Sequence, residues 1–173
     1  MADYNHHIEF LTATILRWQH LLANDSYKQI IIDSLQWLHN EERCKIYGFV
    51  IMPNHIHLLW RINDKLARGE VQGALLSYTA HQFKKRLAEE DKAKLKNHFV
   101  GDADRNFQFW ERDAMVKECW SESFLVQKLE YIHNNPCQQH WKLVEVPEKY
   151  QWSSAAFYQR GHCQFDWLTH YAT

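Results

Sequence analysis

The segment that most constrains this chain is residues 47–62, YGFVIMPNHIHLLWRI, which predicts two short strands joined at Pro53-Asn54. Side chains alternate between the two faces of a strand. In the second strand His55 and His57 therefore share one face, and an apolar face lies behind them, formed by Ile56, Leu58, Trp60 and Ile62. Two imidazoles one strand repeat apart can share a metal ion, provided that the strand is held firmly. The alternative is that both histidines are surface polar residues on a half-buried sheet.

Composition indicates a soluble globular domain. The chain has 173 residues, of which 46% are hydrophobic and 24% are charged, and this length is enough for one core without disulfides or metals as staples. No apolar run approaches the roughly 20 residues of a transmembrane helix, and the first residues, MADYNHHIEF, lack the apolar region of a secretory signal. The four cysteines are widely separated, without a C-x-x-C pair. We expect a single cytoplasmic domain with no membrane contact.

The overall charge does not by itself indicate a protein that binds polyanions, because the formal net charge is −1. Eight tryptophans and twelve histidines are high numbers for this length. Most of the tryptophans are expected to fill the core, but exposed ones could stack on unpaired bases.

The order of the elements predicts the fold class. Strand-like segments are expected at 8–17, 44–62 (a pair) and 107–116, and helical periodicity appears from Ser26, over about 70–90 and from Ser121 to Pro136, with Asn24, Asp25 and Ser26 all suitable as caps of the first helix. The resulting order β-α-β-β-α-β-α predicts an α+β fold, with an antiparallel sheet and helices packed on one face or near its edges. Trp152-Ser153-Ser154 could cap a last short helix.

Basic residues gather at the end of the second helix. Lys84, Lys85 and Arg86 are followed by three more lysines at 92, 94 and 96, and three acidic residues at 89–91 leave a local excess of three positive charges (six minus three). A solvated helix end is one interpretation, and a contact with a phosphate backbone is the other. On the second interpretation, Lys84, Lys85 and Arg86 are candidate DNA-binding residues. We add two basic residues from later in the chain, Arg112 and Lys128, to these candidates.

The late helix carries a second group of candidates. Tyr131 and Asn135 are four residues apart, so they are neighbours on one helix face, whereas His133 lies nearly opposite Tyr131. If this face lies beside the His55/His57 strand, the amide could complete a metal site and the phenol could attack a group that the metal polarises. The alternative is that Tyr131 is an ordinary core or surface aromatic residue.

Two motifs together resemble a known family. MPNHIHLLW, followed by YIHNNP, is similar to the single-tyrosine HUH transposases, and in particular to their REP-associated (RAYT-like) branch. The similarity covers most of residues 8–158, including FQFWERDAMV and Trp152-Ser153-Ser154. It implies that His55, His57 and Asn135 are metal ligands and that Tyr131 is the nucleophile. After Asn-Pro, where the family often has a small, basic, glycine-containing segment, this chain has residues 137–141, CQQHW.

The resemblance also implies a function. It implies a ferredoxin-like fold and an HUH transposase-like domain, here residues 1–173 with 141–173 as a C-terminal tail. It implies metal-dependent nicking and strand transfer of single-stranded or hairpin DNA through a 5′-phosphotyrosine, as a homodimer or as a monomer. Two imidazoles and an amide suit Mg²⁺ or Mn²⁺, although imidazoles also accept Zn²⁺ or Ni²⁺. The alternatives are an inactive DNA-hairpin-binding protein and a metal-dependent hydrolase without covalent catalysis.

Overall fold

The structure is a computed structural model that describes residues 3–173. Its strands form one four-stranded sheet in the order β2-β3-β1-β4, and every neighbouring pair is antiparallel. This arrangement confirms the α+β class and the antiparallel sheet. The strands are β1 (Glu9–Thr14), β2 (Cys44–Ile51), β3 (His55–Ile62) and β4 (Met115–Glu118), and the α-helices are α1 (Asp25–Asn40), α2 (Arg68–Glu90), α3 (Lys92–Lys96), α4 (Glu122–Asn134) and α5 (Ala155–Arg160).

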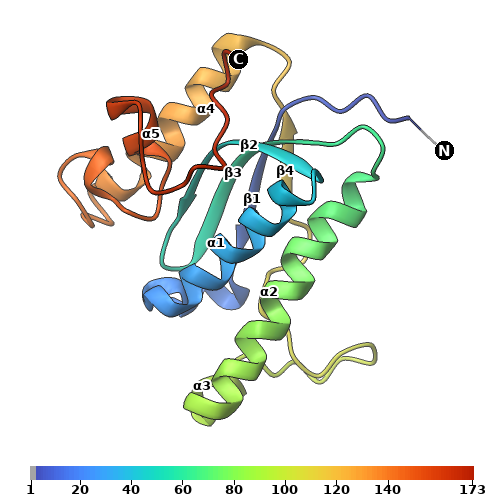
Figure 1. Ribbon diagram of the computed structural model, residues 1–173. Coiled ribbons are helices and arrows are strands. Elements are labelled where there is room, and N and C mark those ends of the chain that lie inside the picture. The colour runs from blue at the N-terminus through green and yellow to red at the C-terminus, as the bar shows by residue number, and fades with distance from the viewer. Residues whose placement is uncertain (1–2) are drawn as a thin grey trace.

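The apolar face of β3 is buried as the alternation predicts. The side chains of Ile56, Leu58, Trp60 and Ile62 are almost fully inaccessible and belong to the main core. Helices α1 and α2 lie side by side across this face of the sheet (Figure 1). Because one face of β3 is held in this core, the side chains on the other face, which include His55 and His57, have a fixed direction.

Helices α1 and α2 have the expected helical stripes. Asn24 is the N-cap of α1, since its Oδ1 accepts a hydrogen bond of 2.9 Å from the backbone N–H of Ser26. In α2 the stripe contains a polar residue, Thr79, which is fully buried. Its hydroxyl donates to Leu75 O (2.8 Å) and accepts from Trp110 Nε1 (3.0 Å), so the burial leaves no unpaired group.

Helix α4 packs on the opposite face of the sheet. Its residues Leu125, Leu129 and Ile132 join a second apolar cluster with side chains of β1, β2 and β3. A Cβ on Gly48 would lie 2.6 Å from Leu129 Cδ1, so the glycine allows α4 to approach β2 closely. The α-helix ends at Asn134, close to Pro136 as expected, but not for the expected reason. Asn135 keeps α-helical φ and ψ values (−54° and −47°), and the chain continues in a 3-10 turn over Asn135–Cys137. The regular helix stops because proline has no N–H to donate to the preceding turn. Helices α1 and α2 thus pack together on one face of the sheet, as expected, and α4 covers the opposite face.

The prediction of a strand over residues 107–116 is wrong for most of that range. Phe107 and Trp110 form only isolated bridges, and the strand that joins the sheet, β4, begins at Met115. The segment bends because Trp110 turns into the core and because Asp113 has a positive φ of 60°. The first strand likewise ends at Thr14, before a tight turn at Arg17 and Trp18, whose φ values are 56° and 57°.

Residues 141–173, predicted as a tail, pack against β2. Ser153 and Leu168 bridge to Val50 and Ile46, and the Tyr150 hydroxyl donates to Ile51 O over 2.7 Å. The short helix α5 begins directly after Ser154. None of the helices between residues 3 and 173 combines the length and the apolar character that a membrane span requires.

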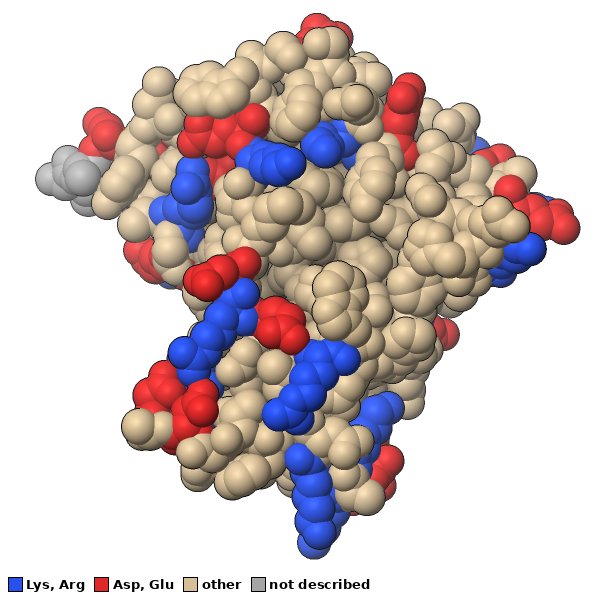
Figure 2. All heavy atoms as spheres, turned by 180° about the vertical axis from the view of Figure 1, so that it is seen from behind, with Lys and Arg blue, Asp and Glu red and all other residues tan. Residues whose placement is uncertain are grey.

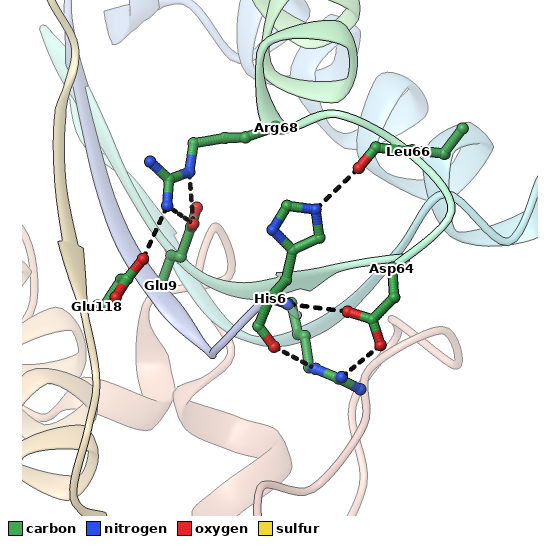
Figure 3. Close-up of polar contacts among 7 residues, drawn as sticks. His6, Glu9, Asp64, Leu66, Arg68 and Glu118 are labelled. Carbon is green, nitrogen blue, oxygen red and sulfur yellow. Dashed lines mark hydrogen bonds and ion pairs between the residues drawn. The ribbon is translucent and has the colours of Figure 1, made fainter. Parts of the chain in front are cut away.

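Ion pairs connect the start of α2 to the sheet. Arg68 contacts the carboxylates of Glu9 on β1 and Glu118 on β4 (Figure 3). Glu9 is only 1% exposed, so Arg68 supplies the charge that its buried carboxylate needs. Beside them, Asp64 accepts hydrogen bonds from the His6 backbone N–H (2.9 Å) and from Arg61 (2.7 Å). These contacts join β1, β4 and α2 on one side of the molecule.

Candidate active site

A cavity of about 650 Å³ opens on the face of the sheet that carries His55 and His57. Its walls come from β1 and the turn that follows it, from β3 and β4, and from α4 and the segment that follows α4. The lining residues are Phe10, Thr12, Thr14, Trp18, Asn54, His55, His57, Met115, Lys128, Tyr131, Asn135, Gln138, His140 and Trp141. The cavity therefore contains all four residues that the sequence indicated as metal ligands or nucleophile.

The two histidines lie next to each other and are uncharged at neutral pH. Their ring centroids are 4.7 Å apart. Burial, reinforced by the nearby His140, lowers the pKa of His55 to about 4. Burial, with the neighbouring His55 and the charge of Lys128, lowers the pKa of His57 to about 3. Neutral imidazoles retain the lone pair that a metal ion requires.

The orientation of His55 is set by Asn54. The His55 Nδ1–H donates to Asn54 Oδ1 over 2.7 Å, and the amide nitrogen of Asn54 in turn lies 3.4 Å from Trp18 O. Since the amide oxygen can only accept, Nδ1 carries the proton and Nε2 carries the lone pair. This arrangement is typical of a metal-binding histidine, whose second nitrogen is fixed by a hydrogen bond.

His57 is oriented by Thr12 on the neighbouring strand. The antiparallel register places Thr12 opposite His57, and Thr12 Oγ1 lies 2.8 Å from His57 Nδ1. The other nitrogen, Nε2, is buried and has no hydrogen-bond partner within residues 3–173. A buried polar atom without a partner is costly unless something else satisfies it. The orphaned Nε2 therefore fits a metal ion as its missing partner.

Tyr131 and Asn135 reach the same cavity from α4 and its C-terminal cap. The Tyr131 ring lies 5.2 Å from the His57 ring, centroid to centroid, and is 44% exposed. Asn135 is 4% exposed. His133 points the other way, as its helical angle predicts: it is buried, and its Nε2 lies 2.8 Å from Ser154 Oγ. The helix thus presents a phenol and an amide to the histidine pair and turns its own imidazole away.

The donor set consists of two imidazoles and an amide. Within the described residues no three His, Cys, Asp or Glu side chains form a group that could hold a metal ion. Asn135 lies outside that definition, and a carboxamide oxygen is a ligand that Mg²⁺ and Mn²⁺ accept. The residues present are therefore compatible with a divalent cation held by His55, His57 and Asn135.

Lys128 is the only Lys or Arg among the described residues that line the cavity. It precedes Tyr131 by one helical turn, and its ammonium lies 5.0 Å from the Phe10 ring centroid and 5.7 Å from that of Tyr131. These aromatic faces hold the charge beside the phenol through cation–π contacts. Of the five candidate DNA-binding residues, Lys128 is the one that the fold brings to the site.

The other four candidates lie elsewhere. Lys84, Lys85 and Arg86 are on α2, which covers the opposite face of the sheet (Figure 1). Lys84 lies over the Phe107 ring, and Arg86 donates to Ser26 O (3.0 Å). Arg112 pairs with Asp102 over 2.6 Å. Seen from the side away from α1 and α2, Lys and Arg are interleaved with Asp and Glu (Figure 2).

Among the cavity residues that the sequence did not single out, Thr12, Asn54 and His140 act directly on the histidine pair. Thr12 and Thr14 alternate on β1 as His55 and His57 do on β3, and the register sets Thr14 opposite His55. This matching alternation was a usable signal, but it needs the strand pairing to be known. His140 and Trp141 occupy the segment that departs from the family pattern, and both line the cavity.

Comparisons with known proteins find a family and a similar fold. The sequence matches the family model described as "Transposase IS200 like" over residues 2–135. The REP-associated tyrosine transposase bound to a REP hairpin is similar in structure, with a TM-score of 0.67 and 16% identity over 98% of this chain and 89% of that chain. A putative transposase from Deinococcus radiodurans has a TM-score of 0.49 and 17% identity, over 78% of this chain and 94% of the other. No curated protein matches the sequence significantly.

The two informative matches support each other. The structural likeness, at 16% identity, establishes a common fold over nearly the whole chain. The family model covers well over half of the sequence, and its range includes the His55/His57 strand, Tyr131 and Asn135. The chain belongs to the IS200-like transposase family.

Proposed function

We propose that this chain nicks and rejoins single-stranded DNA through a covalent bond between Tyr131 and a 5′-phosphate. The observation that carries the proposal is the position of the Tyr131 ring, 5.2 Å from the ring of His57 in a cavity shared with His55 and Asn135. A phenol beside two oriented, neutral imidazoles is the arrangement that a metal-assisted nucleophile requires.

His55, His57 and Asn135 would hold a divalent cation, Mg²⁺ or Mn²⁺. When bound, such a cation withdraws negative charge from a phosphodiester and fixes its orientation. Asn54 and Thr12 contribute by holding the two imidazoles in their directions, so that the ligand positions are formed before DNA arrives. Lys128 adds a positive charge on the tyrosine side of the cavity, where it attracts the phosphate.

In the nicking step the phenol oxygen of Tyr131 forms a bond to phosphorus, and the bond from phosphorus to the 3′ oxygen breaks. The phenol loses one proton and the departing 3′ oxygen gains one. The products are a 5′-phosphotyrosine and a free 3′-OH, so the energy of the phosphodiester bond is kept for rejoining. The same chemistry in reverse, with another 3′-OH, transfers the strand.

The nucleophile and the ligands come from one chain. Tyr131, His55, His57 and Asn135 of a single chain all line the same cavity. We infer that the tyrosine acts in cis, and that a monomer holds the complete set of groups.

Hairpin DNA is the substrate that we favour. The structural relative with a TM-score of 0.67 is bound to a REP hairpin, and a hairpin presents unpaired nucleotides beside a duplex. An open cavity with one lysine suits an unpaired strand, because a duplex would bring two phosphate backbones and call for a broader positive surface.

The proposal is tested with hairpin oligonucleotides that carry single-stranded extensions, incubated with Mn²⁺ and separated on denaturing gels. We expect a covalent protein–DNA adduct and a fragment with a free 3′-OH from the native chain. Tyr131→Phe should give neither and should still bind the hairpin, because only the hydroxyl is removed. Tyr78→Phe is the matched control, since Tyr78 is an exposed tyrosine on α2.

Three results would contradict the proposal in different ways. An adduct that persists in Tyr131→Phe would identify another nucleophile. Free 5′-phosphate products that are never attached to protein would indicate a hydrolase. Tight hairpin binding without an adduct in any divalent metal would indicate a binding protein that does not turn over.

A further inference from the structure

The two ends of the cavity differ in character. Tyr131, Lys128 and Phe10 surround His57 at one end. At the other end the ring of Trp141 lies 6.0 Å from that of His55, and Trp18 joins the rim through its contact with Asn54. The first end carries the charge and the nucleophile, and the second offers flat aromatic surfaces.

Trp18 is exposed although it is a large aromatic residue. Its side chain is 66% accessible, whereas Trp60, Trp110 and Trp167 are buried in the core. The cavity that it lines also contains the polar side chains of Thr14 and His140. An indole face in a cavity that also carries hydrogen-bonding groups suits an unpaired nucleobase, which stacks on its flat side and bonds at its edges. An apolar partner would leave those polar groups unpaired.

The backbone holds Trp18 in a conformation that tryptophan rarely adopts. Arg17 and Trp18 both have positive φ, 56° and 57°. The turn is fixed by hydrogen bonds, from Arg17 N to Glu111 Oε1 (2.6 Å) and from Trp18 N to Ile15 O (2.9 Å). Strained backbone of this kind persists only where the surrounding structure determines it, and it gathers at functional sites.

The same turn is connected to a metal-ligand candidate. The carbonyl of Trp18 lies 3.4 Å from the amide nitrogen of Asn54, and Asn54 Oδ1 holds His55. Backbone bonds join the two segments more firmly, from Ile15 N to Asn54 O (2.8 Å) and from Leu22 N to Pro53 O (2.9 Å). The backbone that carries the Trp18 side chain is thereby fixed relative to His55.

We propose that Trp18 is a stacking platform for one unpaired nucleobase next to the scissile phosphate, with Trp141 on the same side of the cavity. The proposal rests on the function proposed above, since it places the base at the His55 end while the phosphate lies between the histidines and Tyr131. Trp18 is then a positioning residue: it fixes the register of the strand and does not touch the reacting atoms.

The test measures binding, in the Tyr131→Phe background and without added metal, so that it does not depend on chemistry. Hairpins with 2-aminopurine at each unpaired position near the cleavage site report stacking, because an aromatic side chain quenches its fluorescence. We expect quenching at one or two adjacent positions, lost in Trp18→Ala. Anisotropy should show a Kd about 5- to 150-fold weaker for Trp18→Ala, the range of a single base–aromatic stack.

Removing the base completes the test. An abasic site at the quenched position should weaken binding of the native chain, and Trp18→Ala should then cause no further loss. Trp18→Gly removes the same ring and also relaxes the positive φ, so it covers the case in which the alanine variant folds poorly. Trp37→Ala is the matched control, because Trp37 is 49% exposed and lies on α1.

The proposal is overturned if Trp18→Ala and Trp18→Gly bind every hairpin as tightly as the parent, with unchanged fluorescence, while the native chain still forms adducts. The reverse result, quenching by Trp18 without any adduct, would leave the base site standing and would reject the proposed chemistry. The two failures are therefore distinguishable.

Discussion

The rings of Tyr131 and His57 lie 5.2 Å apart and meet at 66°, although one residue is on a late helix and the other on a central strand. The antiparallel sheet brings them together, because α4 crosses the face of β3 that carries the histidines. Their proximity links a phenol to a metal-ligand candidate within one chain.

Divalent cations should stabilise the folded protein. At a free Mn²⁺ concentration of 100 times Kd, the expected gain in unfolding free energy is about 2.7 kcal/mol, which appears as a rise in Tm. His57→Ala removes the orphaned Nε2 and should abolish most of this rise. His81→Ala is the control, since His81 is exposed on α2. An equal rise in Tm in the two variants would contradict the ligand assignment.

Metal affinity should be nearly constant between pH 6 and pH 8. The folded chain lowers the pKa of His55 to about 4 and that of His57 to about 3, so both rings are already neutral over this range and protons do not compete. Over the same range, two ordinary imidazoles with a pKa near 6.5 would each lose about fourfold in affinity as the pH falls from 8 to 6. Calorimetric titration with Mn²⁺ at several pH values distinguishes these outcomes.

Thr12→Val should weaken metal binding without unfolding the chain. Valine has nearly the shape of threonine but cannot bond to His57 Nδ1, so the imidazole loses the contact that orients it. Loss of such a supporting bond typically costs 10- to 100-fold in metal affinity, and we expect about this effect on the Kd for Mn²⁺. Thr14→Val, two residues along β1 in the same cavity, is the matched control. Equal Kd values for Mn²⁺ in Thr12→Val and Thr14→Val would show that Thr12 does not act through His57.

Arg68→Ala should destabilise the fold by about 2 to 3 kcal/mol. It leaves the buried carboxylate of Glu9 without its charged partner, and the penalty is reduced because the Arg68 side chain is itself 41% exposed. Arg112→Ala breaks an exposed pair with Asp102 and should cost less than about 1 kcal/mol. Urea denaturation measures both, and similar costs for the two variants would show that the Glu9 contact is not special.

Much of the site could be predicted from the sequence because it depends on local periodicity. Alternation along a strand sets His55 beside His57, and helical spacing sets Tyr131 beside Asn135 and turns His133 away. The resemblance of the two motifs to a family then joined the two halves, and the family model confirms that membership.

The remaining features depend on contacts between distant segments. Thr12 reaches His57 only through the β1–β3 register, and Asn54 meets Trp18 only because the turn after Ile15 folds against the β2–β3 connection. The aromatic residues at 107–116 predicted a strand, but Trp110 packs in the core, where its Nε1–H donates to Thr79 Oγ1. Charge alone suggested Lys84 and Arg86, which the fold places away from the cavity.

The most direct test of the account is to find which residue carries the DNA. The native chain is incubated with a hairpin oligonucleotide and Mn²⁺, digested with nuclease and protease, and analysed by mass spectrometry. We expect a nucleotide 5′-phosphate attached to the peptide that contains Tyr131. A nucleotide attached to any other residue, or adducts in equal yield from Tyr131→Phe, would contradict it.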